Sequence, residues 1–120
     1  ALKLSLLQKV QTISGVPMIL EQMLLPSADA AKQLCFQLKQ ELNNPVVVLA
    51  YLAEDKPGLA IYVDDQWVAE RGWNASQMIR ECAKEIQGGG GGQPFFATAG
   101  GKNAEGLSAA LASAKALLGA

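Results

Sequence analysis

Five consecutive glycines, Gly88 to Gly92, form the most unusual segment of this 120-residue chain, and Gly100-Gly101-Lys102-Asn103 follows soon after. Each ordered glycine costs roughly 0.5–1 kcal/mol of backbone entropy relative to alanine. A flexible linker would escape that cost but usually carries serine and charge, whereas residues 88–101 carry no charge and helix-like and apolar sequence flanks the run. Such a segment offers the chemistry of backbone amides. The sequence therefore predicts an ordered loop that a ligand approaches closely, with a flexible tether as the alternative.

The order of elements around the run excludes the two common glycine-rich nucleotide loops. A phosphate-binding loop needs Gly-Lys-Ser/Thr directly before a helix, but Gln93-Pro94 occupies that place. A dinucleotide-binding fingerprint needs a strand before the glycines and a helix directly after them. Here a predicted helix precedes the run and a predicted extended segment follows it, so neither loop is expected.

The second glycine pair stands just before the predicted last helix, for which Asn103 is the expected N-cap. Free amides at the N-terminus of a helix attract anions, and Lys102 would add a positive charge. An anion site at residues 100–103 is one hypothesis. Ordinary capping of the helix by Asn103 is the other.

Few other residues could perform chemistry. The chain has no histidine and two cysteines, Cys35 and Cys82, which excludes Ser-His and Cys-His nucleophilic pairs and an ordinary zinc site. We interpret both cysteines as buried apolar residues and Asp64-Asp65 as solvated turn residues. Both tryptophans are assigned to packing, whereas one ring of Phe95-Phe96 could stack on a base or a ribose. No catalytic residue, cofactor or metal ligand is predicted.

The hydrophobic pattern predicts the elements that must position these segments. Apolar residues at helical spacing predict three helices, over 28–42, 75–86 and 104–118, with N-caps at Ser27, Asn74 and Asn103. Apolar runs predict strands over 16–25, 46–52, 59–63 and 95–98, with a hairpin turn at 54–58 and an unassigned link at 66–73. The sum is an α/β domain, a small mixed β-sheet with about three helices packed on it.

The first residues show a separate pattern. Leu2, Leu6 and Val10 recur at helical spacing, which predicts the last turns of a longer helix. We therefore divide the chain into residues 1–12, the remnant of an upstream helical segment, and residues 13–120, the globular domain.

The charges are few and nearly balanced, with a formal net charge of −1 at pH 7. This balance argues against a broad basic surface for nucleic acid, and between Val46 and Gln87 four basic residues stand against seven acidic ones. No apolar run has membrane-spanning length, and no signal peptide is visible. We expect a cytoplasmic protein with neither DNA nor a membrane among its partners.

The segment from Gly88 to Asn103 resembles a known family. The glycine run, Pro94, and Ala97-Thr98-Ala99-Gly100-Gly101-Lys102-Asn103 before an Ala/Leu-rich helix are similar to the C-terminal domain of alanyl-tRNA synthetases. This is the glycine-rich DHHA1 type that is also attached to DHH phosphoesterases. Upstream matches at Ile13-Ser14-Gly15-Val16 and at Val46-Val47-Val48-Leu49-Ala50 extend the resemblance over nearly the whole chain.

The resemblance implies a non-catalytic tRNA-binding domain of an alanine–tRNA ligase, which contacts the tRNA elbow and helps to present one tRNA to the aminoacylation and editing sites. It implies ATP and zinc only in the rest of the synthetase. The partners would be tRNA, the other synthetase domains and, through the N-terminal helix, a second copy. The implied RNA-binding residues are Gly88, Gly89, Gly90, Gly91, Gly92, Gln93, Gly100, Gly101, Lys102 and Asn103, with Arg80 and Lys84 on the preceding helix.

Two departures from the family pattern bear on this role. The family often has a sixth glycine where Gln87 stands and an arginine where Gln93 stands. An arginine would contact phosphate, so its absence predicts weak RNA binding by this chain.

Two other functions stay open at this point. The domain could serve mainly dimerisation, through its N-terminal helix and its Ala-rich last helix. It could also be the nucleotide-binding lobe of a DHH phosphoesterase, although that family commonly carries a histidine after the glycines and this chain has none.

Overall fold

The two strands of the predicted hairpin form the centre of the fold. The computed structural model describes residues 2–119 and pairs β3 (Val46–Ala53) antiparallel with β4 (Lys56–Val63). Most residues of both strands are buried, as their continuous apolar runs require when a strand is covered on both faces.

Four further strands complete a six-stranded sheet with the order β1-β2-β3-β4-β6-β5. They are β1 (Gln11–Ile13), β2 (Val16–Leu24), β5 (Gly89–Gly92) and β6 (Phe96–Gly100). β2 and β3 are parallel, and the other neighbouring strands of the described chain are antiparallel. The predicted mixed sheet is confirmed.

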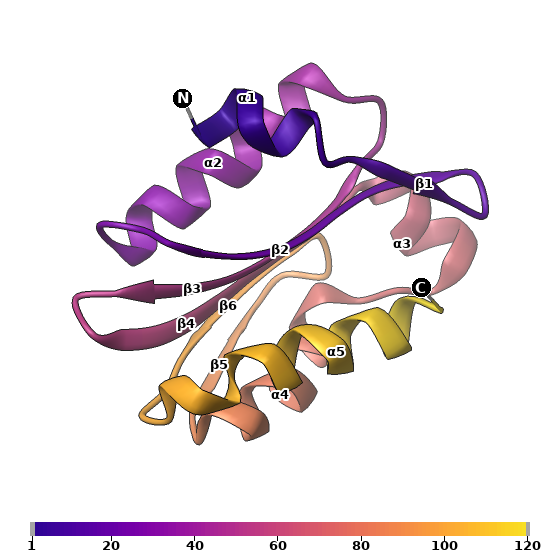
Figure 1. The fold of residues 1–120 in the computed structure, drawn as a ribbon. Helices are drawn as coiled ribbons and strands as arrows, with labels where there is room; N and C mark the ends of the chain where they lie inside the picture. The colour runs from indigo at the N-terminus through magenta and orange to yellow at the C-terminus, as the bar shows by residue number, and fades with distance from the viewer. Residues whose placement is uncertain (1, 120) are drawn as a thin grey trace.

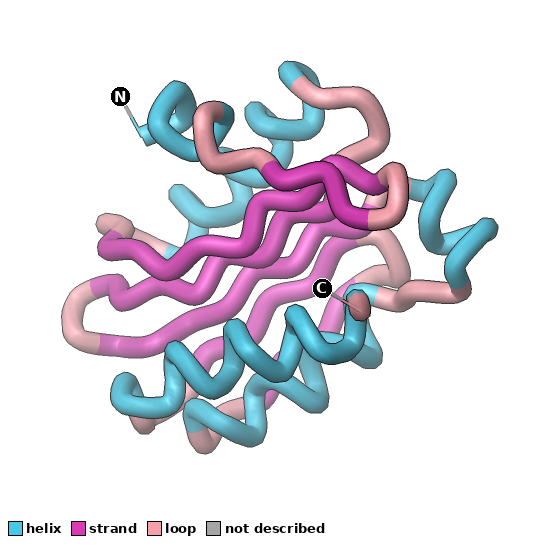
Figure 2. Tube along the Cα trace, turned by 45° about the vertical axis from the view of Figure 1, so that its right-hand side comes forward, coloured by secondary structure: helices cyan, strands magenta, loops and turns pink. Residues whose placement is uncertain are grey.

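Helices cover both faces of this sheet, as Figure 1 shows. α1 (Leu2–Leu7) and α2 (Ala28–Glu41) lie on one face, and α2 forms the crossover between the parallel strands. The other face carries α3 (Asp65–Arg71), α4 (Ala75–Ala83) and α5 (Leu107–Leu118). Short 3₁₀ turns, Lys84–Ile86 and Ala104–Gly106, follow α4 and precede α5. Figure 2 shows the resulting three layers, helix on sheet on helix.

Alternation along β3 divides the core between the two faces. Val46, Val48 and Ala50 belong to a buried cluster with α4 and α5, whereas Val47 and Leu49 belong to a second cluster with α2. Successive residues of a strand point to opposite faces, so one continuous apolar run supplies both cores.

Two of the three predicted N-caps are confirmed. The Ser27 hydroxyl accepts a hydrogen bond from the amide of Ala30 at 3.1 Å, and the Asn74 side chain accepts one from the amide of Gln77 at 3.1 Å. The third prediction is wrong. Asn103 makes no side-chain cap, and its backbone amide instead donates to the Ile86 carbonyl at 2.9 Å, which ties it to the end of the preceding helix.

The hairpin between β3 and β4 is tighter than predicted. Glu54 and Asp55 alone form the turn, with φ of +51° and +66°, while residues 56–58 belong to β4. Two consecutive positive φ values define a type I′ turn, for which Asn-Gly is the usual signal. Because Glu54-Asp55 stands where Asn-Gly would be expected, the sequence pattern does not show where the turn begins and ends.

The unassigned link at 66–73 contains helix α3, and the predicted solvated turn at Asp64-Asp65 is corrected by it. Asp64 is the N-cap and accepts a hydrogen bond from the amide of Gln66 at 3.3 Å, while Asp65 lies in the first helical turn. Acidic residues are favourable there because they oppose the helix dipole. Because α3 has only 7 residues, its apolar periodicity is too short to predict a helix.

The N-terminal helix ends earlier than its predicted stripe. α1 ends at Leu7, and β1 begins at Gln11. Val10 therefore lies between the two elements and not on the helix. Leu6 is buried in the cluster around α2. The predicted division between residues 12 and 13 falls inside β1 and stays a prediction. Within the described part of the chain, no helix has the length and apolar character that crossing a bilayer requires.

Candidate functional site

The glycine run forms the edge strand β5. Gly89 lies opposite Gly100 of β6, and Gly91 lies opposite Thr98. The prediction of an ordered backbone is confirmed. The prediction of a loop is wrong, because the main chain of the run pairs with β6.

Space requires glycine at alternate positions of the run. A Cβ on Gly90 would lie 2.6 Å from the Cα of Ala99, which is too close for any side chain. A Cβ on Gly89 or Gly91 would meet no atom within 4 Å. A Cβ would also clash at Gly88 and Gly92. Gly88, Gly90 and Gly92 therefore allow the main chain of the run to lie close to β6, whereas Gly89 and Gly91 leave an open surface.

A row of glycines crosses the sheet from the run to β4. Tyr51 of β3 pairs with Gly58 of β4, Gly58 with Gly100 of β6, and Gly100 with Gly89 of β5. We call Gly58, Gly100 and Gly89 the glycine lane. Residues opposite each other in neighbouring strands project to the same face, so the first side chain along this row is that of Tyr51.

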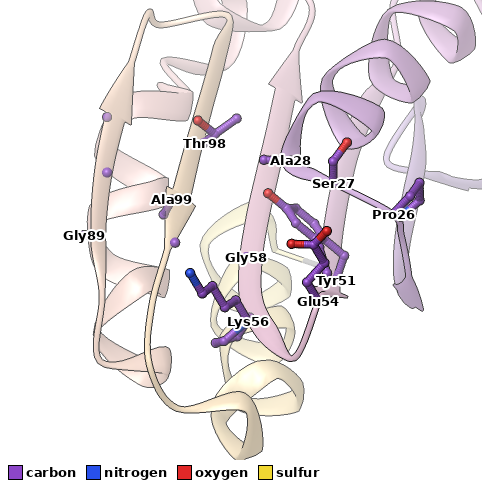
Figure 3. A pocket seen from close by; sticks show the side chains of 15 residues that line it. Pro26, Ser27, Ala28, Tyr51, Glu54, Lys56, Gly58, Gly89, Thr98 and Ala99 are labelled. Atoms are coloured by element: carbon purple, nitrogen blue, oxygen red, sulfur yellow. The ribbon is translucent and has the colours of Figure 1, made fainter.

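The glycine lane lies in a groove of about 610 Å³ (Figure 3). The start of α2, at Ser27 and Ala28, lines one side, and Lys56 lies near the turn between β3 and β4. The volume is within the range of roughly 300–1,000 Å³ that is typical of ligand sites. The remaining lining residues include Pro26, Ala53, Glu54, Pro57, Gly90, Gly91, Thr98 and Ala99.

Tyr51 lies across the groove floor. A Cβ on Gly58 would be 2.6 Å from the Tyr51 Oη, so the end of the ring rests directly on that glycine, and Figure 3 shows the ring crossing β4. Tyr51 is 3% exposed and lines the groove. Burial raises the pKa of its hydroxyl above the ordinary tyrosine value.

The groove is nearly uncharged. Lys56 and Glu54 are its charged lining residues among those the structure describes, and they have opposite signs. Its other polar lining groups are backbone groups and the hydroxyls of Ser27, Tyr51 and Thr98. Residues 2–119 contain no cluster of three or more histidine, cysteine, aspartate or glutamate side chains that could hold a metal ion.

The predicted anion site at residues 100–103 is not formed. Gly100 ends β6, and the amide of Gly101 donates to the Pro57 carbonyl at 3.1 Å. The amides of Lys102 and Asn103 both donate to the Ile86 carbonyl at 2.9 Å. These three amides already have partners inside the protein, so they offer no free donors to an anion.

The structure brings four of the predicted RNA-binding residues together in the groove: Gly89, Gly90, Gly91 and Gly100. Gln93 lies in the turn after β5, where its amide donates to the Phe96 carbonyl at 2.8 Å. Arg80 and Lys84 belong to α4 and its 3₁₀ extension, on the other face of the sheet from α2. Their predicted contact with RNA stays a prediction, but they do not form one track with the groove.

The two adjacent phenylalanines have different surroundings. Phe95 is 38% exposed, whereas the Phe96 ring packs on Phe36 of α2 with 5.2 Å between ring centroids. Of the two rings considered for stacking, the exposed one is Phe95.

Tyr51, Gly58 and Lys56 are among the groove residues that the sequence did not assign to a site. A lone glycine inside a strand often marks a close approach of another group. Gly58 was assigned to the hairpin turn because it follows Pro57, and this hid the signal. Tyr51 and Lys56 carried no local signal, since one lies in an apolar run and the other beside a turn.

Comparison with known proteins identifies the family. A model of the DHHA1 domain matches residues 15–120. Alanine–tRNA ligase of Cytophaga hutchinsonii is 48% identical over 118 residues, and that of Christiangramia forsetii is 41% identical over 117 residues. Both matches cover 98% of this chain, which spans 14% and 13% of the length of these relatives.

Solved structures agree with this assignment. The C-Ala domain from Aquifex aeolicus alanyl-tRNA synthetase superposes with a TM-score of 0.79 at 25% identity, and the match covers 92% of this chain and 98% of that domain. A DHH-domain protein described as a member of the s1p family of ribosomal proteins shares the fold alone, with a TM-score of 0.54 at 12% identity over 89% of this chain and 28% of that protein. The resemblance seen in the sequence is therefore confirmed: the chain belongs to the DHHA1 domain family and is similar to the C-Ala domain of alanyl-tRNA synthetase, outside the catalytic part of that enzyme.

Proposed function

We propose that this domain binds tRNA along the glycine lane, as a non-catalytic part of an alanine–tRNA ligase. The observation that carries the proposal is the lane itself, a stretch of sheet without side chains inside a groove. We propose tRNA as the ligand because the relatives are alanine–tRNA ligases. Contact at the tRNA elbow, and work in the cytoplasm beside the other synthetase domains, belong to the same proposal.

The lane suits a sugar–phosphate backbone better than a base pair. The sugar and phosphate atoms of an RNA strand can approach the glycine lane closely, because Gly89 and Gly91 leave open space above the sheet. Lys56 can pair with one phosphate, and a single pairing of this kind gives weak and salt-dependent binding. Recognition of RNA by shape and sugar contacts needs few charges, which agrees with the nearly uncharged lining. ATP and zinc, if the whole enzyme uses them, would be held by its other domains.

The rival functions have less support in the geometry. Leu6 of α1 and the small residues Ala110 and Ala114 of α5 are buried within this chain, so a second copy could contact these helices only through exposed residues such as Leu4 and Leu117. The likeness to a DHH-domain protein extends to the fold alone.

A substitution that fills the groove tests whether tRNA binds there. Gly91→Leu should place a side chain in the open space beside the lane without disturbing the strand, because a Cβ there has no neighbour within 4 Å. Binding of alanine tRNA, an unrelated tRNA and a mononucleotide should be measured at two salt concentrations. We expect the two tRNAs to bind alike and Gly91→Leu to weaken both by tenfold or more.

The matched control is Ala112→Leu, on the exposed side of α5 across the sheet, which should leave tRNA binding unchanged. Equal binding by wild type, Gly91→Leu and Ala112→Leu would place the RNA elsewhere. The double variant Arg80→Ala/Lys84→Ala then shows whether α4 provides that surface.

The charge on Lys56 predicts a specific salt dependence. Lys56→Ala should reduce the slope of log affinity against log salt by about 1, as removal of one phosphate contact does. Lys115→Ala on α5 removes the same charge far from the groove and should leave the slope unchanged. Equal slopes for all three proteins would remove Lys56 from the interface.

A further inference from the structure

The ring of Tyr51 is buried, whereas its hydroxyl opens into the groove without a hydrogen-bond partner among residues 2–119. Tyr51 is 3% exposed and lines the groove. Among the side-chain hydrogen bonds of residues 2–119, the other tyrosine hydroxyl, that of Tyr62, donates to Asp64 at 3.1 Å, and none involves the Tyr51 hydroxyl. Since no buried side-chain nitrogen or oxygen of these residues lacks a partner, the unpaired Tyr51 hydroxyl is accessible from the groove and free to bind a ligand there.

The surroundings of this hydroxyl define what it can contact. It rests on Gly58, at the end of the glycine lane. A tyrosine hydroxyl is neutral at pH 7, so it can both donate and accept a hydrogen bond. A neutral group that donates and accepts is complementary to another hydroxyl.

We propose that the Tyr51 hydroxyl binds a ribose 2′-hydroxyl and so makes the groove select RNA over DNA. The inference rests on the proposed tRNA binding at the lane. It assigns to one residue the distinction between the two nucleic acids, because the 2′-hydroxyl is the group by which a protein tells RNA from DNA at a given site.

A ribose fits this position better than a base edge or a phosphate. Reading a base edge specifically takes paired donors and acceptors at fixed spacing, whereas the lane presents backbone on either side of Gly58 and one hydroxyl. A phosphate would be drawn to the Lys56 ammonium group, at the turn end of the groove, and not to the neutral Tyr51 hydroxyl. The sugar is the part of a nucleic-acid strand that the side-chain-free glycine lane, with the Tyr51 hydroxyl at its end, can hold.

Tyr51→Phe removes the hydroxyl and keeps the ring that covers Gly58. Because this hydroxyl has no partner inside the protein, we expect the thermal melting of the variant to match that of wild type. Affinity should be measured for an alanine tRNA transcript and for a DNA strand of the same sequence, at a salt concentration lowered until both bind the wild-type protein measurably. We expect Tyr51→Phe to weaken RNA binding about three- to tenfold, the effect of one neutral hydrogen bond, and to leave DNA binding unchanged.

Tyr62→Phe is the matched control, since it removes the other tyrosine hydroxyl, whose partner is Asp64, and Tyr62 is not among the groove-lining residues. It should leave the ratio of RNA to DNA affinity as in wild type. An unchanged ratio in Tyr51→Phe, or an equal loss for RNA and DNA, would overturn the inference while Gly91→Leu still reports on the proposed function. If Gly91→Leu also leaves tRNA binding unchanged, the proposed function itself fails.

Discussion

At the scale of single residues, the glycines of the run have two different reasons to be glycine. Gly90 allows β5 to approach β6, since its hydrogen points at Ala99, whereas Gly91 faces open space. Gln87 just before the run has a φ of +53°, the left-handed region that favours glycine. The resemblance to the family places a sixth glycine at this position.

This difference predicts opposite effects of one substitution at adjacent positions. Gly90→Ala should lower the free energy of unfolding by about 1–3 kcal/mol, as overpacking does. Gly91→Ala should leave it unchanged or raise it by about 0.4–1 kcal/mol, because alanine restricts the unfolded chain. Urea unfolding of both variants measures the two changes, and similar values for them would contradict the alternation.

At the scale of elements, local hydrogen bonds decide where helices begin. Asn74 caps α4 through its side chain, while the similar Asn103 is tied to Ile86 by its backbone amide and leaves α5 to start at Leu107. Both asparagines precede an amphipathic stretch, so the sequence alone treats them alike.

The contrast gives a measurable difference in stability. Asn74→Ala should lower the free energy of unfolding by about 1 kcal/mol, the usual effect of losing an N-cap. Asn103→Ala removes no cap, and its side-chain amide lies 3.5 Å from the Glu85 carbonyl, so its effect should be less than half as large. Thermal or urea unfolding checks both, and an equal loss would restore Asn103 as a cap.

At the scale of the whole molecule, the sheet separates two hydrophobic clusters, and each holds one buried cysteine. Cys35 of α2 is fully buried, and burial raises the pKa of its thiol from 9.0 to about 12. The structure therefore confirms that Cys35 and Cys82 are buried.

The burial of Cys35 predicts loss of stability at alkaline pH. Above about pH 9 the thiol loses its proton in the unfolded chain and keeps it in the folded one until about pH 12, so the unfolded state binds fewer protons and stability falls across this window. Below pH 9 both states are protonated and the thiol contributes no slope. Cys35→Ala should show a shallower fall between pH 9 and pH 11 in denaturant unfolding, and a profile identical to wild type would contradict this assignment.

Much of the fold was predictable because its signals are local. The stripe Ala31, Leu34, Cys35 and Leu38 is buried as its spacing indicates, and Val46–Ala53 is the central strand that its apolar run indicates. The exact bounds of the turn at Glu54-Asp55 and the short helix α3 were not predicted, because the turn lacks the usual residue types and the helix is too short for local rules to recognise.

The sequence by itself determined the main helices and strands and the family, since each depends on residues close together in the chain. Only the tertiary structure decided that the glycine run is a strand and that Gly58, Gly100 and Gly89 meet beside Tyr51. The physical reason is strand register. Register fixes which distant residues face each other, and a shift of one residue would send each of them to the opposite face of the sheet.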